Sequence, residues 1–279
     1  MNRIKSLFIS AWITLLFVGL ARAGWVLWQS PEAKDWYWVV LALAPAALLF
    51  IWVFTADVAR AAMAPRIVFA LTLLPLAGIM ITGVVNVEIW LWVAIVGSLG
   101  SALYEWWYSR FGDRSSEILV VGQRLPALEF ELPDGSTLST ESLAKPMLMI
   151  FYRGNWCPLC MAQVKEIAGQ YRTLAEKGVQ VMLISPQPHR ETESLARRFE
   201  APMTFLVDKA NRMAEKLGIK SENGLPTGLE ALGYDSDTVL PTVVMTDASG
   251  TIIFADLTDN YRVRPEPDVF IEVFERAGI

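Results

Sequence analysis

The chain has 279 residues, of which 53% are hydrophobic and 19% are charged, and its formal net charge at pH 7 is −5. The first 109 residues carry 6 Lys and Arg and 5 Asp and Glu, whereas the remaining 170 carry 18 and 24. A nucleic-acid-binding protein needs a basic face, so this charge balance excludes nucleic acid as the expected partner. The length and the uneven charge together predict two unlike parts, one for lipid and one for water.

The first part, residues 1–109, is predicted to be a four-helix transmembrane bundle in contact with membrane lipid. Each of four apolar segments approaches the roughly 20 residues needed to cross the hydrocarbon core. A cleaved signal peptide is the competing interpretation of the first segment. That segment is longer than a typical h-region of about 7 to 15 residues, and three more spans follow it. The predicted spans are residues 7–28, 36–54, 67–85 and 87–108.

Basic residues at the ends of the spans predict the orientation. They occur at the N-terminus, in the loop after the second span and at the exit from the fourth, whereas the opposite loops offer only Lys34. By the positive-inside rule, we expect a multi-pass protein of the cell (inner) membrane with both termini and the second domain in the cytoplasm. The residues counted are Arg3, Lys5, Arg60, Arg66, Arg110 and Arg114.

Arg22 interrupts the first span, in its outer half for this orientation. An intramembrane charge either extends toward the interface or pairs with an opposite charge within the bundle. Glu88 and Glu105 are the acidic candidates for such a pair.

A polar linker at 110–117 leads into the second part, residues 118–279, where predicted strands and helices alternate. Apolar runs without polar alternation indicate central strands that are covered on both faces. The alternation followed by a hairpin and a final helix predicts an α/β domain with a mixed central sheet flanked by helices. The predicted strands are 128–132, 137–139, 147–152, 179–184, 204–207, 238–245 and 251–255. The predicted helices are 158–178, 191–199, 211–217 and 269–276, and 221–237 is predicted to be a loop insertion or a distorted helix.

The stretch FYRGNWCPLC, residues 151–160, contains both cysteines of the chain, and they are separated by two residues. Cys157 is predicted to lie at the first turn of a helix, where free backbone N–H groups and the helix dipole favour a thiolate. Cys160 lies one turn further on, close enough to attack a mixed disulfide on Cys157. The competing interpretations are buried structural cysteines or a metal site. The chain offers no further Cys and only one His, His189, so we predict no metal.

Several separate blocks resemble the thioredoxin-like superfamily. The closest resemblance is to its redoxin branch of alkyl hydroperoxide reductase and thiol-specific antioxidant proteins, often called peroxiredoxin-like. The blocks are VGQRLPALEFELPDGSTLS, MIFYRGNWCPLC, VQVMLISPQP, MTFLVD and LPTVVMTDASGTIIF. The resemblance implies a C-terminal thioredoxin-like fold and a redox-active disulfide with no cofactor.

The resemblance also implies roles for individual residues. Cys157 would be the nucleophile and Cys160 the more buried resolving thiol, next to Trp156 and Pro158. In this superfamily a cis proline lies opposite the CxxC motif, and Pro241 takes that role here.

The chain departs from both templates that the resemblance offers. In a peroxiredoxin the peroxidatic cysteine follows a Pro-x-x-Thr/Ser-x-x-Cys pattern. Cys160 occupies that position, but the upstream proline is missing and the segment around Pro241 holds no arginine. Arg153 is the candidate substitute. In a thioredoxin a buried acid lies six positions before the first cysteine, where this chain has Phe151.

A missing acid would leave water or another carboxylate as the base, with Glu129 and Glu131 as candidates. His189, between Pro188 and Arg190, is interpreted as a solvated loop histidine rather than a base for Cys157.

The sequence therefore leads to a membrane-anchored thiol:disulfide oxidoreductase as the first hypothesis. Its partners would be a disulfide-bearing protein or a small thiol, and an electron donor that the sequence does not identify. A peroxiredoxin-like thiol peroxidase that reduces hydroperoxides is the alternative. A redox sensor or scaffold without enzymatic activity is the third. The CxxC motif supports dithiol chemistry in each case but sets neither its direction nor its substrate.

Overall fold

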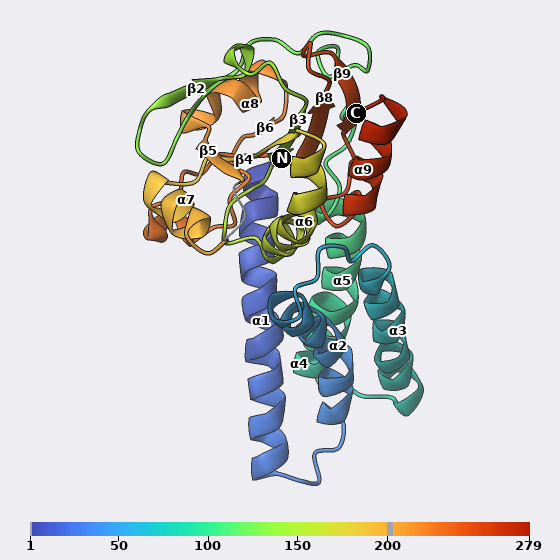
Figure 1. The fold of residues 1–279 in the computed structure, drawn as a ribbon. Coiled ribbons are helices and arrows are strands. Elements are labelled where there is room, and N and C mark those ends of the chain that lie inside the picture. The colour runs from blue at the N-terminus through green and yellow to red at the C-terminus, as the bar shows by residue number, and fades with distance from the viewer. Residues whose placement is uncertain (1, 200–202) are drawn as a thin grey trace.

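The structure, a computed structural model, describes residues 2–199 and 203–279. Four helices form one end of the molecule and an α/β domain forms the other (Figure 1). Each of the four is long and apolar enough to cross a membrane. They are α1 (Asn2–Gln29), α2 (Trp36–Thr55), α3 (Ala64–Thr82) and a fourth helix over Val87–Tyr108. The fourth comprises α4 (Val87–Trp90), a π-helical segment (Leu91–Leu99), α5 (Gly100–Leu103) and a second π-helical segment (Tyr104–Tyr108).

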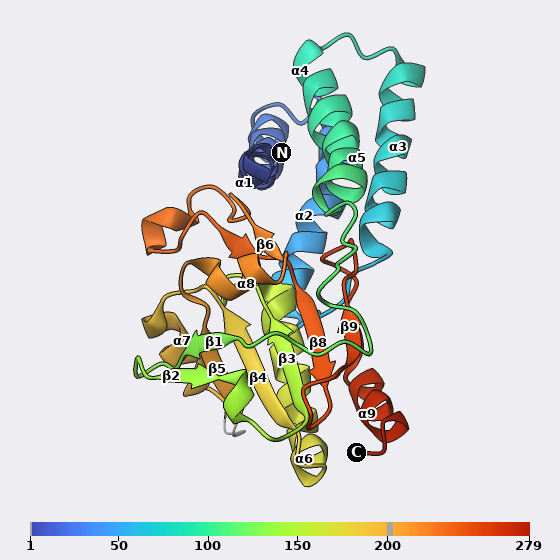
Figure 2. The same cartoon turned by 90° about the horizontal axis from the view of Figure 1, so that it is seen from above.

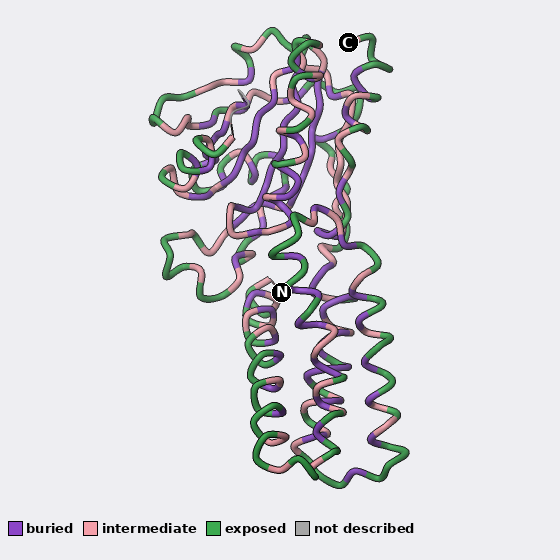
Figure 3. The backbone as a smooth tube through the Cα atoms, turned by 60° about the horizontal axis from the view of Figure 1, so that its bottom comes forward, coloured by how far each residue is buried: buried purple, intermediate pink, exposed green. Residues whose placement is uncertain are grey.

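The helical bundle turns apolar side chains outward. Figure 3 shows exposed positions along the outer faces of the helices, and many are large and hydrophobic, such as Leu15, Phe17 and Leu41. Inside the bundle the helices pack closely, and a side chain at Gly100 would collide with the indole of Trp12. Arg22 pairs with Glu88, with 3.0 Å between Nε and Oε1, so one of the two predicted intramembrane pairings of Arg22 is confirmed.

A seven-stranded mixed sheet organises the α/β domain, in the order β2-β1-β5-β4-β3-β8-β9. Strands β3, β4 and β5 are parallel, and the remaining neighbours pair antiparallel. The predicted fold class, a four-helix bundle followed by a thioredoxin-like domain, is confirmed. The strands are β1 (Glu129–Glu131), β2 (Thr137–Ser139), β3 (Met147–Phe151), β4 (Gln180–Ser185), β5 (Thr204–Val207), β8 (Thr242–Thr246) and β9 (Ile252–Asp256).

Helices cover both faces of this sheet (Figure 2). Along β3 the side chains alternate, because successive residues of a strand point to opposite faces. Leu148 and Ile150 join the apolar cluster of α6 and α9, and Met149 and Phe151 join the cluster on the other face. The first cluster continues without a break into the core of the helical bundle. The helices are α6 (Pro158–Glu176), α7 (His189–Ala196), α8 (Arg212–Lys216) and α9 (Pro267–Arg276).

The predicted strand 238–245 is two strands in the structure. Proline has no N–H to donate to a ladder, and pairing changes at Pro241. Before it, β7 (Thr238–Val239) pairs with β6 (Lys220–Ser221) in a separate small sheet, and after it β8 joins the main sheet. The segment between β6 and β7 was predicted as a loop insertion or a distorted helix. It is a loop with a short 3₁₀ turn at Leu229–Leu232.

Buried polar contacts hold the α/β domain against the ends of the membrane helices. Arg262 is 1% exposed and pairs with Glu105, which also accepts from Arg66 at 2.9 Å. The hydroxyls of Tyr104 and Tyr261 lie 2.6 Å apart. A buried ion pair stabilises a protein only when its partners are well aligned and their hydrogen bonds are satisfied. These contacts therefore favour one arrangement of the helical bundle against the α/β domain.

Candidate active site

The CxxC motif lies at the junction of β3 and α6, on the side of the α/β domain that faces the helical bundle. Cys157 is the N-cap of α6, and its sulfur accepts the backbone N–H of Cys160 at 3.4 Å. Pro158 occupies the first helical position, where a backbone N–H would make no hydrogen bond within the helix. The sequence thus places both sulfurs at the start of a helix, as the spacing predicted.

Gly154 shapes the turn between strand and helix. Its φ is +147°, a conformation that side chains rarely adopt, and a Cβ there would lie 2.5 Å from the indole nitrogen of Trp156. The indole of Trp156 in turn lies under the guanidinium of Arg153, 4.7 Å from the ring centroid. The turn therefore orients Trp156 and Arg153 beside the thiols.

The two thiols are buried and share one negative charge. Cys157 is 2% exposed and Cys160 is fully buried. Burial and the neighbouring Cys160 raise the pKa of Cys157 well above its usual value. Burial also opposes a thiolate at Cys160, but the hydrogen bond from Cys157 and the guanidinium of Arg264 lower its pKa to about 5. At neutral pH the thiolate is thus on Cys160 and the proton on Cys157. The predicted thiolate at Cys157 is therefore wrong, because burial and the neighbouring Cys160 outweigh the helix start.

Arg264 is the residue that the sequence analysis missed. Its Nη2 donates to the sulfur of Cys160 at 3.4 Å, and its Nη1 donates to Gln163 at 2.6 Å. It is 5% exposed and lies in the segment between β9 and α9. The family pattern predicts the arginine near Pro241, where this chain has none, and Arg153 was the substitute inferred from the sequence. The YRVRP run, residues 261–265, was the available signal, since it places two arginines just before the last helix.

Arg153 is the second guanidinium at the site. It is 8% exposed, and its Nη2 donates to the carbonyl of Gly224 at 2.6 Å. Its positive charge is among the causes that lower the pKa of Cys160. The structure therefore places Arg153 where the sequence analysis suggested a substitute arginine, in addition to Arg264.

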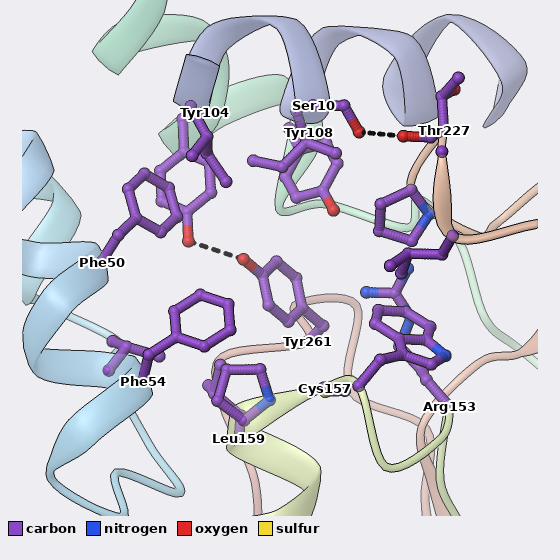
Figure 4. A pocket seen from close by; sticks show the side chains of 18 residues that line it. Ser10, Phe50, Phe54, Tyr104, Tyr108, Arg153, Cys157, Leu159, Thr227 and Tyr261 are labelled. Carbon is purple, nitrogen blue, oxygen red and sulfur yellow. Dashed lines mark hydrogen bonds between the residues drawn. The ribbon is translucent and has the colours of Figure 1, made fainter. Parts of the chain in front are cut away.

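Cys157 borders a cavity of about 280 Å³ between the two parts of the molecule (Figure 4). Side chains of α1, α2 and the fourth helix form one side, and residues of the α/β domain form the other. Cys160 and Arg264 are not among the residues that line it. The cavity is thus a route to Cys157 alone. Aromatic rings account for much of the wall, namely those of Phe50, Phe54, Tyr104, Tyr108, Trp156 and Tyr261.

The expectation that Pro241 carries a cis peptide bond is wrong. Among the residues that the structure describes, no peptide bond is cis. The carbonyl of Pro241 accepts Arg114 at 2.8 Å, and the N–H of Leu240 donates to Ile219 at 2.8 Å. The backbone around Pro241 is therefore used inside the protein, and Pro241 does not line the cavity beside Cys157.

Other candidates from the sequence lie apart from the thiols. His189 begins α7, with its Nε2 2.9 Å from Glu131, and Glu131 also faces Lys209 at 3.5 Å. Glu129 is on β1, and in the sheet β5 and β4 lie between β1 and β3, the strand that leads to the thiols. In the described part of the chain no group of three or more His, Cys, Asp or Glu residues could hold a metal ion.

The sheet order and the dithiol at the start of α6 define a redoxin-type domain with a thioredoxin-like fold. Residues 121–255 match the AhpC/TSA family, and four apolar helices precede this region.

Two curated proteins show the relationship in sequence. A chloroplastic peroxiredoxin Q of Populus jackii is 26% identical over 102 residues, which are 36% of this chain and 48% of that protein. A putative peroxiredoxin bcp of Coxiella burnetii (strain RSA 493 / Nine Mile phase I) is 28% identical over 100 residues, 36% of this chain and 66% of that protein. The chain thus spans between about half and two thirds of these relatives.

Solved structures show similar folds. The crystal structure of Enterococcus faecalis AhpC is 17% identical, with a TM-score of 0.46 over 57% of this chain and 92% of that one. The crystal structure of peroxidoxin BcpB from Mycobacterium tuberculosis is 15% identical, with a TM-score of 0.46 over 56% of this chain and 96% of that one.

Proposed function

We propose that the protein is a membrane-anchored thiol oxidoreductase that cycles Cys157 and Cys160 between a dithiol and a disulfide. The single observation that carries this proposal is the coupled pair at the start of α6. Cys157 accepts the amide of Cys160 at 3.4 Å, and Arg264 donates to the sulfur of Cys160 at 3.4 Å. A thiolate in an electropositive, partly enclosed setting is the reactive form of cysteine.

The charge on Cys160 offers the base that the sequence lacks at Phe151. As Cys157 attacks a small disulfide, its proton passes to the Cys160 thiolate and one substrate sulfur leaves as a thiolate. The leaving thiolate then takes the proton from Cys160. Cys160 attacks the mixed disulfide, the internal disulfide forms, and the second substrate sulfur leaves as a thiolate. One substrate disulfide becomes one thiol and one thiolate, and the dithiol monoanion becomes a disulfide.

The burial of Cys157 favours small substrates over protein disulfides. Its side chain is 2% exposed and lies beneath the ends of α1 and α2, so a folded partner has no surface on which to reach it. The test is reduction of hydroxyethyl disulfide and of insulin by the full chain in detergent micelles. We expect reduction of the small disulfide and not of insulin. The Arg276→Gln control should keep this activity. If the Cys157→Ser variant retained full activity, the proposal would fail.

Hydroperoxide reduction is the second candidate, and one contact favours it. Cys160 occupies the peroxidatic position of the family pattern and has an arginine on its sulfur. Two relatives are also called peroxiredoxins. Here the Cys160 thiolate would take one oxygen of a hydroperoxide, releasing an alkoxide that leaves as the alcohol. Condensation of the sulfenic acid with Cys157 would then release water. Peroxide consumption by the full chain without disulfide reduction would favour this candidate over the first.

The third hypothesis, a redox sensor or scaffold, makes a different prediction for a double variant. If cells keep the full function of the protein when Cys157 and Cys160 are both serine, its role does not depend on dithiol chemistry. Loss of function in that variant, with normal membrane abundance, excludes a scaffold.

The basic residues of the short loops support a cytoplasmic AhpC/TSA domain in the cell membrane. The test is a Leu232→Cys variant in which Cys157 and Cys160 are serine, since Leu232 is 69% exposed on that domain. An impermeant maleimide should label it in inverted vesicles and not in intact cells. Labelling of intact cells would reverse the orientation.

A further inference from the structure

The cavity beside Cys157 is open to the apolar ends of two membrane helices. Ile13 of α1 and Phe54 of α2 belong to its lining, and Phe54 is 62% exposed on the bundle surface. Each is within a turn or two of residues that contact the α/β domain, such as Ser10, whose hydroxyl donates to Thr227 at 2.8 Å. A molecule dissolved in lipid could thus reach Cys157 between α1 and α2 without crossing water.

The polar groups that reach the cavity are mainly hydrogen-bond donors. The guanidinium of Arg153 and the hydroxyl of Tyr108 point into it (Figure 4). The hydroxyl of Tyr261 lies 2.6 Å from that of Tyr104, and burial raises the pKa of Tyr261 well above its usual value, so this hydroxyl keeps its proton. Among the described residues that line the cavity, none carries a carboxylate. The occupant that fits these groups is a neutral or anionic acceptor of hydrogen bonds.

We propose that this cavity binds the head group of a lipid-soluble quinone, which accepts two electrons from the Cys157 and Cys160 dithiol. The inference rests on the proposed dithiol cycle and names a lipid-soluble electron acceptor for it, beside the small disulfide. Aromatic walls suit a flat ring, and the donors suit its two carbonyl oxygens. A volume of about 280 Å³ is near the lower limit of ligand pockets, roughly 300 Å³, so it accommodates a ring while the tail remains in lipid.

A fatty acyl hydroperoxide is the other lipid-soluble oxidant of thiols, and the geometry favours it less. It has no ring for the aromatic walls. Its peroxide group would also have to reach the thiolate of Cys160 beside Arg264, and neither residue lines the cavity. Cys157, the thiol that does border the cavity, is the one that the quinone would meet.

The electron balance of the proposed step is complete. The sulfur of Cys157 adds to a ring carbon, its proton passes to Cys160, and the developing oxyanion accepts hydrogen bonds from Arg153 and Tyr108. Cys160 then gives its proton to the reduced ring and attacks the sulfur of Cys157. The carbon–sulfur bond breaks, and its electron pair leaves with the ring. One proton from the dithiol monoanion and one from water complete the quinol, and the protein retains a disulfide.

The test uses the full chain in lipid nanodiscs, reduced and freed of reductant, mixed without oxygen with a decyl-substituted benzoquinone. We expect the loss of one quinone for each pair of thiols. Quinone absorbance measures the first quantity and thiol titration the second. Ile13→Trp should fill the cavity and slow this reaction at least about tenfold, equivalent to about 1.4 kcal/mol. Leu15→Trp on the same helix is the matched control, since Leu15 is 41% exposed and is not a cavity residue, and it should react as the unmodified chain does.

Each other result has a defined meaning. If the dithiol reduces hydroxyethyl disulfide but leaves the quinone intact, or consumes a fatty acid hydroperoxide instead, the inference is overturned while the proposed cycle stands. If it reacts with none of the three, the proposed cycle itself fails. Equal slowing by the two Trp variants would also overturn the cavity as the site. Should Ile13→Trp not fold, an azidoquinone photolabel on the unmodified chain decides. Its attachment outside residues 9–13, 50–54, 104–108, 153–159, 226–229 and 261 contradicts the site.

Discussion

Replacing Arg264 by glutamine tests the electrostatic basis of the site. Arg264 is 5% exposed and donates to the sulfur of Cys160 at 3.4 Å, to Gln163 at 2.6 Å and to the carbonyl of Tyr261 at 3.2 Å. Glutamine removes the positive charge and keeps a group that can donate hydrogen bonds. The change therefore acts mainly on the charge that faces the Cys160 thiolate.

The size of the effect follows from the distance. An opposite charge within about 4 to 6 Å lowers an acid's pKa by roughly 1 to 3, and each pKa unit corresponds to about 1.36 kcal/mol. With Arg264 present, the pKa of Cys160 is about 5. Burial raises this pKa, but Cys157 and the two arginines lower it by more. Without Arg264 we expect a pKa of roughly 6 to 8. A thiolate persists above its pKa, so at pH 6 the ionised fraction should fall from about nine tenths to between about a half and a hundredth.

The assay is a pH titration of thiolate ultraviolet absorbance on the full chain in detergent. Cys157→Ser serves as the background in both proteins, because serine keeps a hydroxyl beside Cys160 and leaves one thiol to titrate. Arg264→Lys should recover part of the shift, and Arg276→Gln controls for net charge, since its side chain is 73% exposed. Identical titration curves for Arg264→Gln and its background would refute Arg264 as the cause of the low pKa.

Two further substitutions test the frame around the thiols, with unfolding of the full chain by denaturant as the common measurement. Glu105→Gln leaves the buried Arg262 without its carboxylate and should cost about 3 to 5 kcal/mol, and a change below about 1 kcal/mol would contradict a buried pair. Gly154→Ala should cost about 1 to 3 kcal/mol through its φ of +147° and should also slow thiol oxidation by moving Trp156. Gly169→Ala is its control, because a Cβ there meets open space on α6, and it should stabilise by up to about 1 kcal/mol.

The features that the sequence predicted well depend on residues close together in the chain. Long apolar runs indicated four helices, and the apolar strand at Met147 followed by Pro158 indicated β3 and α6. Capping and periodicity act within a few residues, so a single stretch is enough to infer them. Arg22 could be assigned a partner because the bundle offers few carboxylates, and one of the two candidates, Glu88, is that partner.

The features that the sequence missed depend on contacts between distant segments. Arg264 follows Cys160 by more than a hundred residues, and the segment after β9 carries it to the sulfur. Sequence spacing holds no information on that approach, which explains why Arg153 was the only arginine proposed for the site from the sequence. The contact of Arg114, from the linker, with the carbonyl of Pro241 is likewise one between distant segments that the sequence did not predict.

The helical bundle is part of the site as well as its support. Ile13 and Phe54 complete the wall of the cavity, and the ion pair of Arg262 with Glu105 holds that wall against the α/β domain. Without these contacts Cys157 would face water, and burial would no longer raise its pKa above the usual value. The helices of the bundle therefore contribute both a wall of the cavity through which substrates reach Cys157 and part of the burial that favours the proton on Cys157.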